Sequence, residues 1–214
     1  MSLELALGVR LKEEKTVGVQ LSLFNQIKDS TGLQMGLVNG APGENMGTVC
    51  GAQIGVVSAA SYVAGVQSGG VNVSYRVAGL QLGLFDFAGE MDGAQVGFVN
   101  GAEGMDGAQA GFVNGSAHVR GAQLLGLYNH AGTIEGVQLG LVDYAKKVTG
   151  AQLGLANIVS EELTGVQVGL VCCAREGTYA QVGLLTIRRT GPWYARMSPL
   201  VGWHRKQADA PRTH

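Results

Sequence analysis

The sequence predicts an all-β protein, a single-chain β-solenoid (β-helix) of about 13 coils with a period of about 14 residues. Three observations lead to this fold. The phrase Gly-x-Gln-x-Gly-Leu-x-Asn recurs along most of the chain. Its Gln returns mostly every 14 residues, with two intervals of 15 and one of 19. Apolar residues alternate around each Gln, as they do in a β-strand. A β-barrel of short antiparallel strands is the alternative.

The composition supports a folded, repetitive protein. The 214 residues include 35 Gly and 46% hydrophobic residues, and the formal net charge is -1. A disordered chain would be less apolar, and a nucleic-acid-binding protein would be more basic, so we expect neither. The three cysteines, of which Cys172 and Cys173 are adjacent, do not suggest a disulfide framework. No metal-ligand spacing and no cofactor motif is present, so the sequence predicts neither a metal nor a cofactor.

Each repeat reads as a strand with two different faces. The residues on either side of Gln, and the residue two places later, are apolar and are expected to point inward. Gly, Gln and Gly would then form a flat outward strip, on which another sheet can come close. The residues of this hypothetical binding face are Gln67, Gln81, Gln95, Gln109, Gln123, Gln138 and Gln152.

The strand is expected to end at a polar corner five residues after Gln, because Asn and Asp stabilise turns through their own backbone. Stacked amides at this corner can bond to one another along the rod. The ladder is predicted to contain Asn25, Asn39, Asn72, Asn100, Asn114, Asn129 and Asn157. A second apolar residue before each new repeat, such as Val63 or Met91, indicates a shorter inward-facing return strand.

The ends of the chain differ from the repeats, and three segments are predicted. Residues 1–16 are rich in charge and read as an N-terminal cap over residues 17–190, the solenoid. Residues 191–214 read as a C-terminal cap, in which Trp193, Tyr194 and Trp203 close the last coil, followed by a tail.

One repeat stands out within the solenoid. It carries Ser68 and Gly70 where its neighbours have large aliphatic residues. This change predicts either a notch or a gap that adjacent coils fill.

The repeated phrase GxQxGLxN, over about Val17 to Arg189, resembles a family of bacterial surface repeat-containing proteins. The resemblance implies a repetitive β fold, often in a cell-envelope setting, with no established activity. It carries over no functional residue.

The sequence favours a non-enzymatic structural or interaction protein. Its histidines occupy no recurring position beside a nucleophile or a carboxylate, so no catalytic residue is predicted. The expected partner is a second copy or another protein on the flat face. The alternative is a surface protein of the bacterial envelope that binds a polysaccharide or another extended ligand. No segment reaches the roughly 18 apolar residues of a membrane helix, and no signal peptide is evident. The chain as written is expected in the cytoplasm, with the cell envelope as the alternative.

Overall fold

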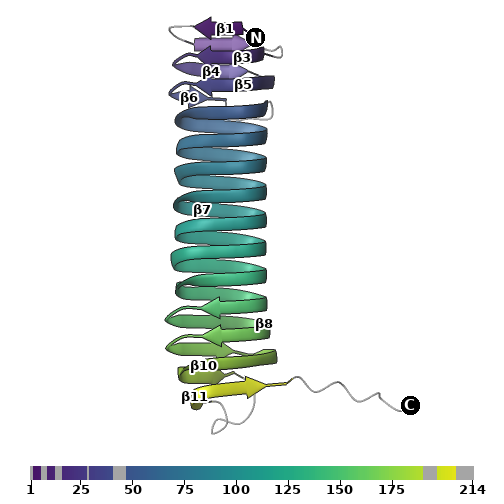
Figure 1. The fold of residues 1–214 in the computed structure, drawn as a ribbon, viewed down its shortest axis with the longest axis vertical. Coiled ribbons are helices and arrows are strands. Elements are labelled where there is room, and N and C mark those ends of the chain that lie inside the picture. The colour runs from purple at the N-terminus through teal and green to yellow at the C-terminus, as the bar shows by residue number, and fades with distance from the viewer. Residues whose placement is uncertain are drawn as a thin grey trace, which may run out of the picture.

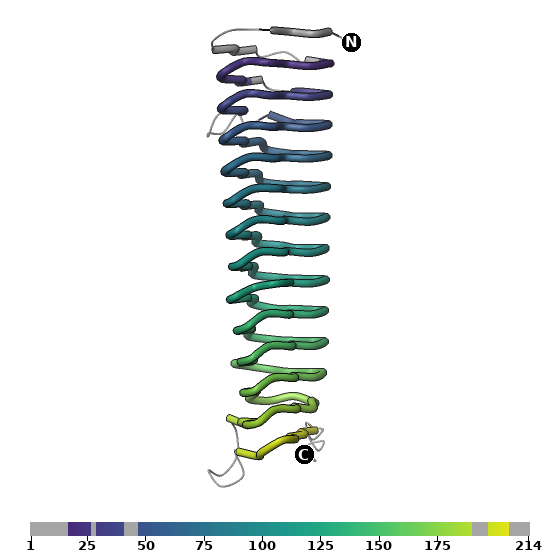
Figure 2. Tube along the Cα trace, turned by 60° about the vertical axis from the view of Figure 1, so that its left-hand side comes forward, coloured from purple at the N-terminus to yellow at the C-terminus, as the bar shows by residue number. Residues whose placement is uncertain are grey.

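The chain forms a straight rod of stacked coils, seen in a computed structural model (Figures 1 and 2). The structure describes residues 2–5, 9–12, 16–27, 29–40, 47–189 and 197–205. All regular elements in these ranges are strands, so the predicted β-solenoid is confirmed. The strands are β1 (Ser2–Leu5), β2 (Val9–Lys12), β3 (Thr16–Leu21), β4 (Phe24–Ile27), β5 (Asp29–Met35), β6 (Val38–Asn39), β7 (Thr48–Leu153), β8 (Ala156–Val168), β9 (Val171–Ala174), β10 (Glu176–Arg188) and β11 (Met197–His204).

Successive coils pair in parallel and in the register that the repeat predicts. Gln20 lies opposite Gln34 where β3 pairs with β5. Gln167 likewise lies opposite Gln181 where β8 pairs with β10. Strand β7 winds through eight coils, from that of Gln53 to that of Gln152, without a break. This parallel register excludes the alternative of short antiparallel strands.

The two ends are built differently. Strands β1 and β2 lie within the segment predicted as an N-terminal cap, yet both pair in parallel with the coil that follows, and Glu4 lies opposite Gln20. Strand β11 instead pairs antiparallel with β10, so the chain reverses direction there. The side chain of Trp203 is 78% exposed and does not close the last coil as expected. Trp193 and Tyr194 lie outside the described residues.

Four columns of side chains fill the interior of the rod. They are the repeat Gln, the corner Asn or its replacement, a small residue seven after Gln such as Ala88, and the aliphatic residue ten after Gln such as Met91. The aliphatic column was predicted from the sequence and is buried. The small column was not foreseen.

The predicted sidedness of the main strand is wrong. The repeat Gln side chains lie inside the rod and are almost inaccessible, while the Leu, Val, Ile and Phe residues that flank them point outward. The supposed binding face is therefore buried at every position, namely Gln67, Gln81, Gln95, Gln109, Gln123, Gln138 and Gln152. A buried polar group is stable only when it is hydrogen-bonded, and the stacked Gln amides from Gln53 to Gln181 meet this condition.

The two glycines of each repeat have separate structural reasons. Gly93 has a φ of 137°, which L-residues rarely adopt, and it turns the chain into the Gln strand. Gly97 points into the rod, where a Cβ would lie 2.8 Å from an oxygen of Asp86 and 2.9 Å from one of Asn100. Close approach therefore occurs inside the rod, between glycine and the corner amides, and not against an outer sheet.

Candidate interaction face

The outward side of the Gln strand carries a continuous apolar surface, which we call the apolar strip. It consists of two columns, one and three residues after each Gln. In the repeat of Gln123 the extra residue Leu125 moves the second column to Leu127. Its members are Leu21, Leu23, Met35, Leu37, Ile54, Val56, Ser68, Gly70, Leu82, Leu84, Val96, Phe98, Ala110, Phe112, Leu124, Leu127, Leu139, Leu141, Leu153, Leu155, Val168, Leu170, Val182 and Leu184. Most of its large residues are exposed, among them Phe98 at 50%.

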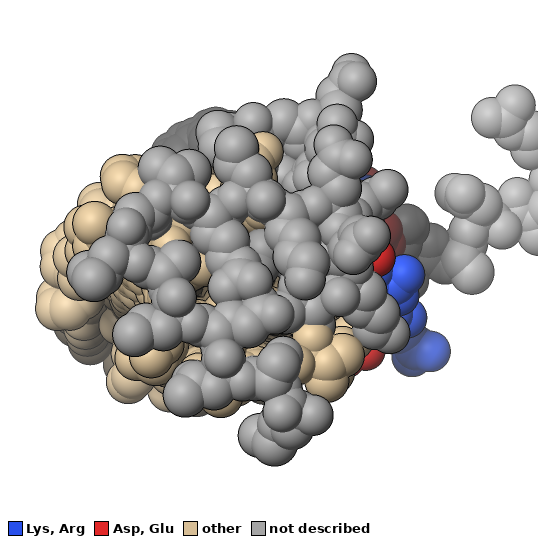
Figure 3. Space-filling model, turned by 90° about the horizontal axis from the view of Figure 1, so that it is seen from above, with Lys and Arg blue, Asp and Glu red and all other residues tan. Residues whose placement is uncertain are grey.

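The strip carries no charge. In every copy, the residues from two before Gln to four after it include no Lys, Arg, Asp or Glu. The charged side chains that are visible along the rod axis gather on one side of the rod (Figure 3). Twelve coils at about 4.8 Å and a width of five residues at about 3.3 Å give a planar area of about 950 Å². Exposed apolar patches on monomeric proteins are usually smaller, about 300–600 Å².

The Gln ladder beneath the strip makes it rigid. Each side-chain amide from Gln53 to Gln181 donates from Nε2 to Oε1 of the preceding coil, at 2.6–2.9 Å. The second hydrogen of Nε2 often bonds a carbonyl of the same coil, as from Gln95 to Gly101 at 3.1 Å. This second bond fixes the orientation of the amide. Each coil is thus tied to the one before it, directly behind the exposed columns.

The corner ladder donates in the opposite direction. Nδ2 of Asn100 bonds Oδ1 of Asn114 in the following coil at 2.8 Å, and also the carbonyl of Ala110 at 3.0 Å. All seven corner Asn residues named from the sequence are buried in this column. Cys172 takes the same place, since its thiol accepts from Asn157 and donates to the carbonyl of Val182. Burial raises the pKa of this thiol, so Cys172 is a packed rung of the ladder.

Two aspartates interrupt the corner ladder. Asp86 accepts from Asn72 at 2.6 Å, but its other oxygen has no partner, and neither has Oδ1 of Asn100 in the next coil. Asp143 and Asn157 repeat this arrangement. An ionised carboxylate has no hydrogen to donate, so two acceptors face each other across one step of the ladder.

The environment of both aspartates favours protonation. Burial raises the pKa of Asp86 to about 6, although hydrogen bonds from Asn72 and the backbone of Gly83 oppose the shift. The pKa of Asp143 rises to about 6 for the same reason, opposed by Asn129 and Gly140. A proton on the free oxygen supplies the missing donor toward the next Asn.

A hollow is one of two irregularities that break the uniformity of the strip. Ser68, Gly69 and Gly70 follow each other in the coil of Gln67, which leaves both columns without a large side chain. The flanking residues of the outer column, Val56 and Leu84, are 57% and 59% exposed. They therefore do not close over the gap, and the notch alternative describes this coil.

The second irregularity is a protrusion in the coil of Gln123. Leu125 is the extra residue of that repeat and adopts a φ of 65°. Gly126 takes the buried position beside Asn129, so Leu125 is forced outward and is 75% exposed. Between hollow and protrusion, the stacked rings of Phe98 and Phe112, with centroids 4.7 Å apart, form a ridge.

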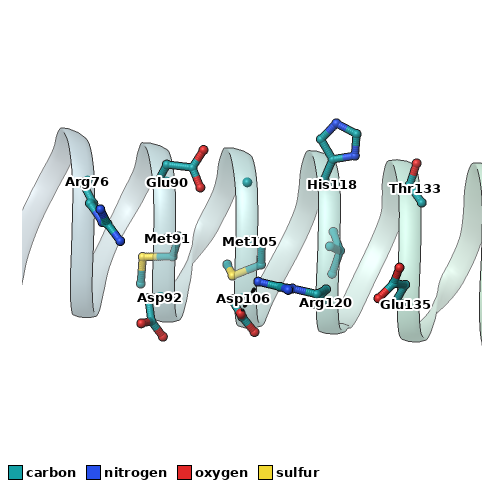
Figure 4. A pocket seen from close by; sticks show the side chains of 12 residues that line it. Arg76, Glu90, Met91, Asp92, Met105, Asp106, His118, Arg120, Thr133 and Glu135 are labelled. Atoms are coloured by element: carbon teal, nitrogen blue, oxygen red, sulfur yellow. Dashed lines mark hydrogen bonds and ion pairs between the residues drawn. The ribbon is translucent and has the colours of Figure 1, made fainter.

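The opposite side of the rod is polar. A groove of about 390 Å³ runs across the coils from Arg76 to Glu135, with Met91 and Met105 turned into the rod beneath it (Figure 4). Arg120 reaches Asp106 of the preceding coil at 2.7 Å, and both side chains are exposed. Among the described residues, no three His, Cys, Asp or Glu side chains are arranged to hold a metal ion.

The surface predicted to interact, the Gln column, is buried, and the exposed strip was not predicted. A usable signal was present in the variability of the columns. Gln occurs in all twelve copies, whereas the position three residues later holds Leu, Val, Gly or Phe. The Gln amide must bond its own copies above and below, so this column is constant while the exposed column varies.

Comparisons with other proteins leave the structure as the guide to function. None of the described residues forms a helix with the length and hydrophobicity needed to cross a membrane. No protein-family model, no curated protein and no solved structure matches the chain.

Proposed function

We propose that this chain is a non-enzymatic interaction protein, a rigid rod that docks the flat apolar surface of a protein partner on its strip. The observation that carries the proposal is the exposed, uncharged apolar surface along twelve consecutive coils. Burial of such a surface against a second sheet is favourable by roughly 25 cal/mol per Å² of apolar area.

The partner that fits this surface is itself flat and apolar. Sheets pack face to face at about 10 Å, with the side chains of the two inner faces interdigitating. The strip offers two parallel columns for this packing. At its C-terminal end the columns and β11 line an open groove of about 440 Å³, with Gly154, Gly169 and Gly183 among its lining residues. Three of the groups with raised pKa values, Asp86, Asp143 and Cys172, are enclosed in the interior, which favours a role in packing over one in catalysis.

The test is the mass of the purified chain in solution. We expect sedimentation velocity at micromolar concentration to show an assembly heavier than the 22.2 kDa chain. The paired change Leu141→Lys and Leu155→Lys places charges in the strip and should release the single chain. Thr149→Lys adds a charge on an exposed residue outside the strip and should leave the assembly intact.

Circular dichroism should show that all variants keep their β-structure, because the altered side chains are exposed. A wild-type chain that sediments alone would refute the proposal. So would an assembly that survives the two lysines.

A further inference from the structure

The strip carries a hollow and a protrusion at positions that match each other. The hollow, at Ser68 to Gly70, lies in the coil of Gln67, and the protruding Leu125 lies in the coil of Gln123. The coil of Gln95 is the midpoint, two coils from each. A two-fold axis through that coil would therefore place the protrusion of each copy opposite the hollow of the other.

We propose that the partner of the strip is a second copy of this chain, packed antiparallel about a two-fold axis at the coil of Gln95. This inference rests on the proposed function of the strip. A two-fold interface uses the same patch on both copies, so a hollow on one copy must meet its complement on the other. Leu125 of each copy fills the space left by Ser68 and Gly70 of its partner.

The alternative two-fold arrangement fits poorly. With the rods parallel, every coil faces its own copy, so hollow meets hollow and Leu125 meets Leu125. A void and a clash would then lie four coils apart in the same interface, and tightly packed interfaces contain neither. Sliding parallel rods by four coils would fill one hollow and leave the other open, in a contact that does not close.

Other positions also match in the antiparallel arrangement. The axis lies along the strand direction, so each column faces the same column of the other copy. Leu82 then faces the small Ala110, and Leu84 faces Phe112. Phe98 meets its own copy at the axis. A large residue therefore meets a small one at Leu82 and Ala110, as it does at the hollow, whereas the other facing pairs are large on both sides.

The size of the interface suits a stable dimer. Eleven coils overlap, from that of Gln20 to that of Gln167, and the coil of Gln181 faces the short strand β1 (Ser2–Leu5). Eleven coils at about 4.8 Å and a width of about 16 Å give about 850 Å² for each copy. The total of about 1,700 Å² equals that of a standard specific interface. The overlapping segments carry no charge that would repel its copy.

Spin-label distances test the orientation without touching the strip. Glu103, Lys146 and Arg175 are exposed residues, each eight places after a repeat Gln. Each is replaced singly by Cys and labelled, in a full-length chain that also carries Cys50→Ser and Cys173→Ser. The remaining Cys172 is buried.

An antiparallel dimer gives the shortest distance for the label at position 103. The two labels at position 146 lie six coils apart along the axis, or about 29 Å, and those at 175 lie ten coils apart, or about 48 Å. A parallel dimer gives one distance for all three positions. That result would overturn the antiparallel proposal and leave the interaction strip standing, whereas a wild-type monomer would overturn both.

Filling the hollow tests the proposed contact between Leu125 of one copy and the hollow of the other. Ser68→Leu introduces the residue that several other coils carry at this position, so the fold should persist. We expect it to raise the dimer dissociation constant more than tenfold. Leu125→Gly removes the protrusion and suits the positive φ of that residue. Added to Ser68→Leu, it should restore the dissociation constant to within a few-fold of wild type.

Thr149→Ala is the control, because Thr149 is exposed and lies outside the strip. It should leave dimerisation unchanged. A Ser68→Leu variant that dimerises as well as wild type would refute this contact. So would a double variant whose dissociation constant does not return toward the wild-type value.

Discussion

The two buried aspartates should make the rod less stable as the pH rises through 6. Asp86 and Asp143 each have a pKa raised by burial from 3.8 to about 6. A group with a raised pKa in the folded state contributes its full stability below its unfolded pKa, near 4. It loses that contribution as the pH passes through the folded value. A difference of about 2.2 pKa units corresponds to about 3 kcal/mol for each carboxyl.

Asp86→Asn with Asp143→Asn should remove this pH dependence. Asn is the usual residue of this column, and its amide donates to the next rung, where Asn100 and Asn157 now lack a partner for Oδ1. We expect the double variant to be more stable than wild type by several kcal/mol at pH 8. The difference should shrink as the pH is lowered toward the unfolded pKa near 4.

Urea unfolding followed by far-UV circular dichroism, at fixed protein concentration between pH 4.5 and 8, measures both expectations. Asp92→Asn is the control, because Asp92 is an exposed carboxylate and should leave the pH dependence in place. A wild-type midpoint that does not fall between pH 5 and 8 would refute the reasoning. A double variant whose urea midpoint depends on pH as strongly as that of wild type would also refute it.

Four further changes, one of them a control, probe the packing of the coils. Gln109→Leu keeps the volume but leaves its partners in the adjacent rungs and Ser116 without their bonds, and should cost about 3 kcal/mol in urea unfolding. Gly107→Ala places a Cβ against the carbonyl of the preceding coil at a φ of 138° and should lower the free energy of unfolding by more than about 2 kcal/mol. Gly115→Ala, whose Cβ would meet only an oxygen at 4.0 Å, should change it by less than about 0.5 kcal/mol. Cys172→Asn restores the amide ladder and should raise the urea midpoint, because the free energy of unfolding increases by about 1 kcal/mol.

The period of the sequence was enough to predict the coil and its register. Gln recurs with nearly constant spacing, and a parallel stack is the arrangement that brings every copy of it into contact with the next. The corner position of Asn also followed from the sequence, because residue type and spacing both indicate a turn. These features depend on local residue patterns and their repetition, and both can be read from the sequence.

The inward and outward faces could not be assigned by alternation alone. Alternation separates two faces of a strand, and hydrophobicity then suggests that Leu and Val point inward. Here the inward position beside the corner amides has room only for glycine, as Gly97 shows by its close approach to Asp86 and Asn100. Gln takes the other inward position of the strand and satisfies its amide on the coils above and below, so the usual cost of burying it is offset.

The opposed directions of the two amide ladders bear on how long such a rod can be. The Gln amides donate toward the N-terminus and the Asn amides toward the C-terminus. Their dipoles point in opposite senses and largely cancel, whereas the peptide dipoles of an α-helix add up. A further coil therefore contributes another pair of bonds without enlarging the partial charges at the ends. Electrostatics sets no upper limit on the number of repeats, and a gene could gain or lose whole coils with little penalty.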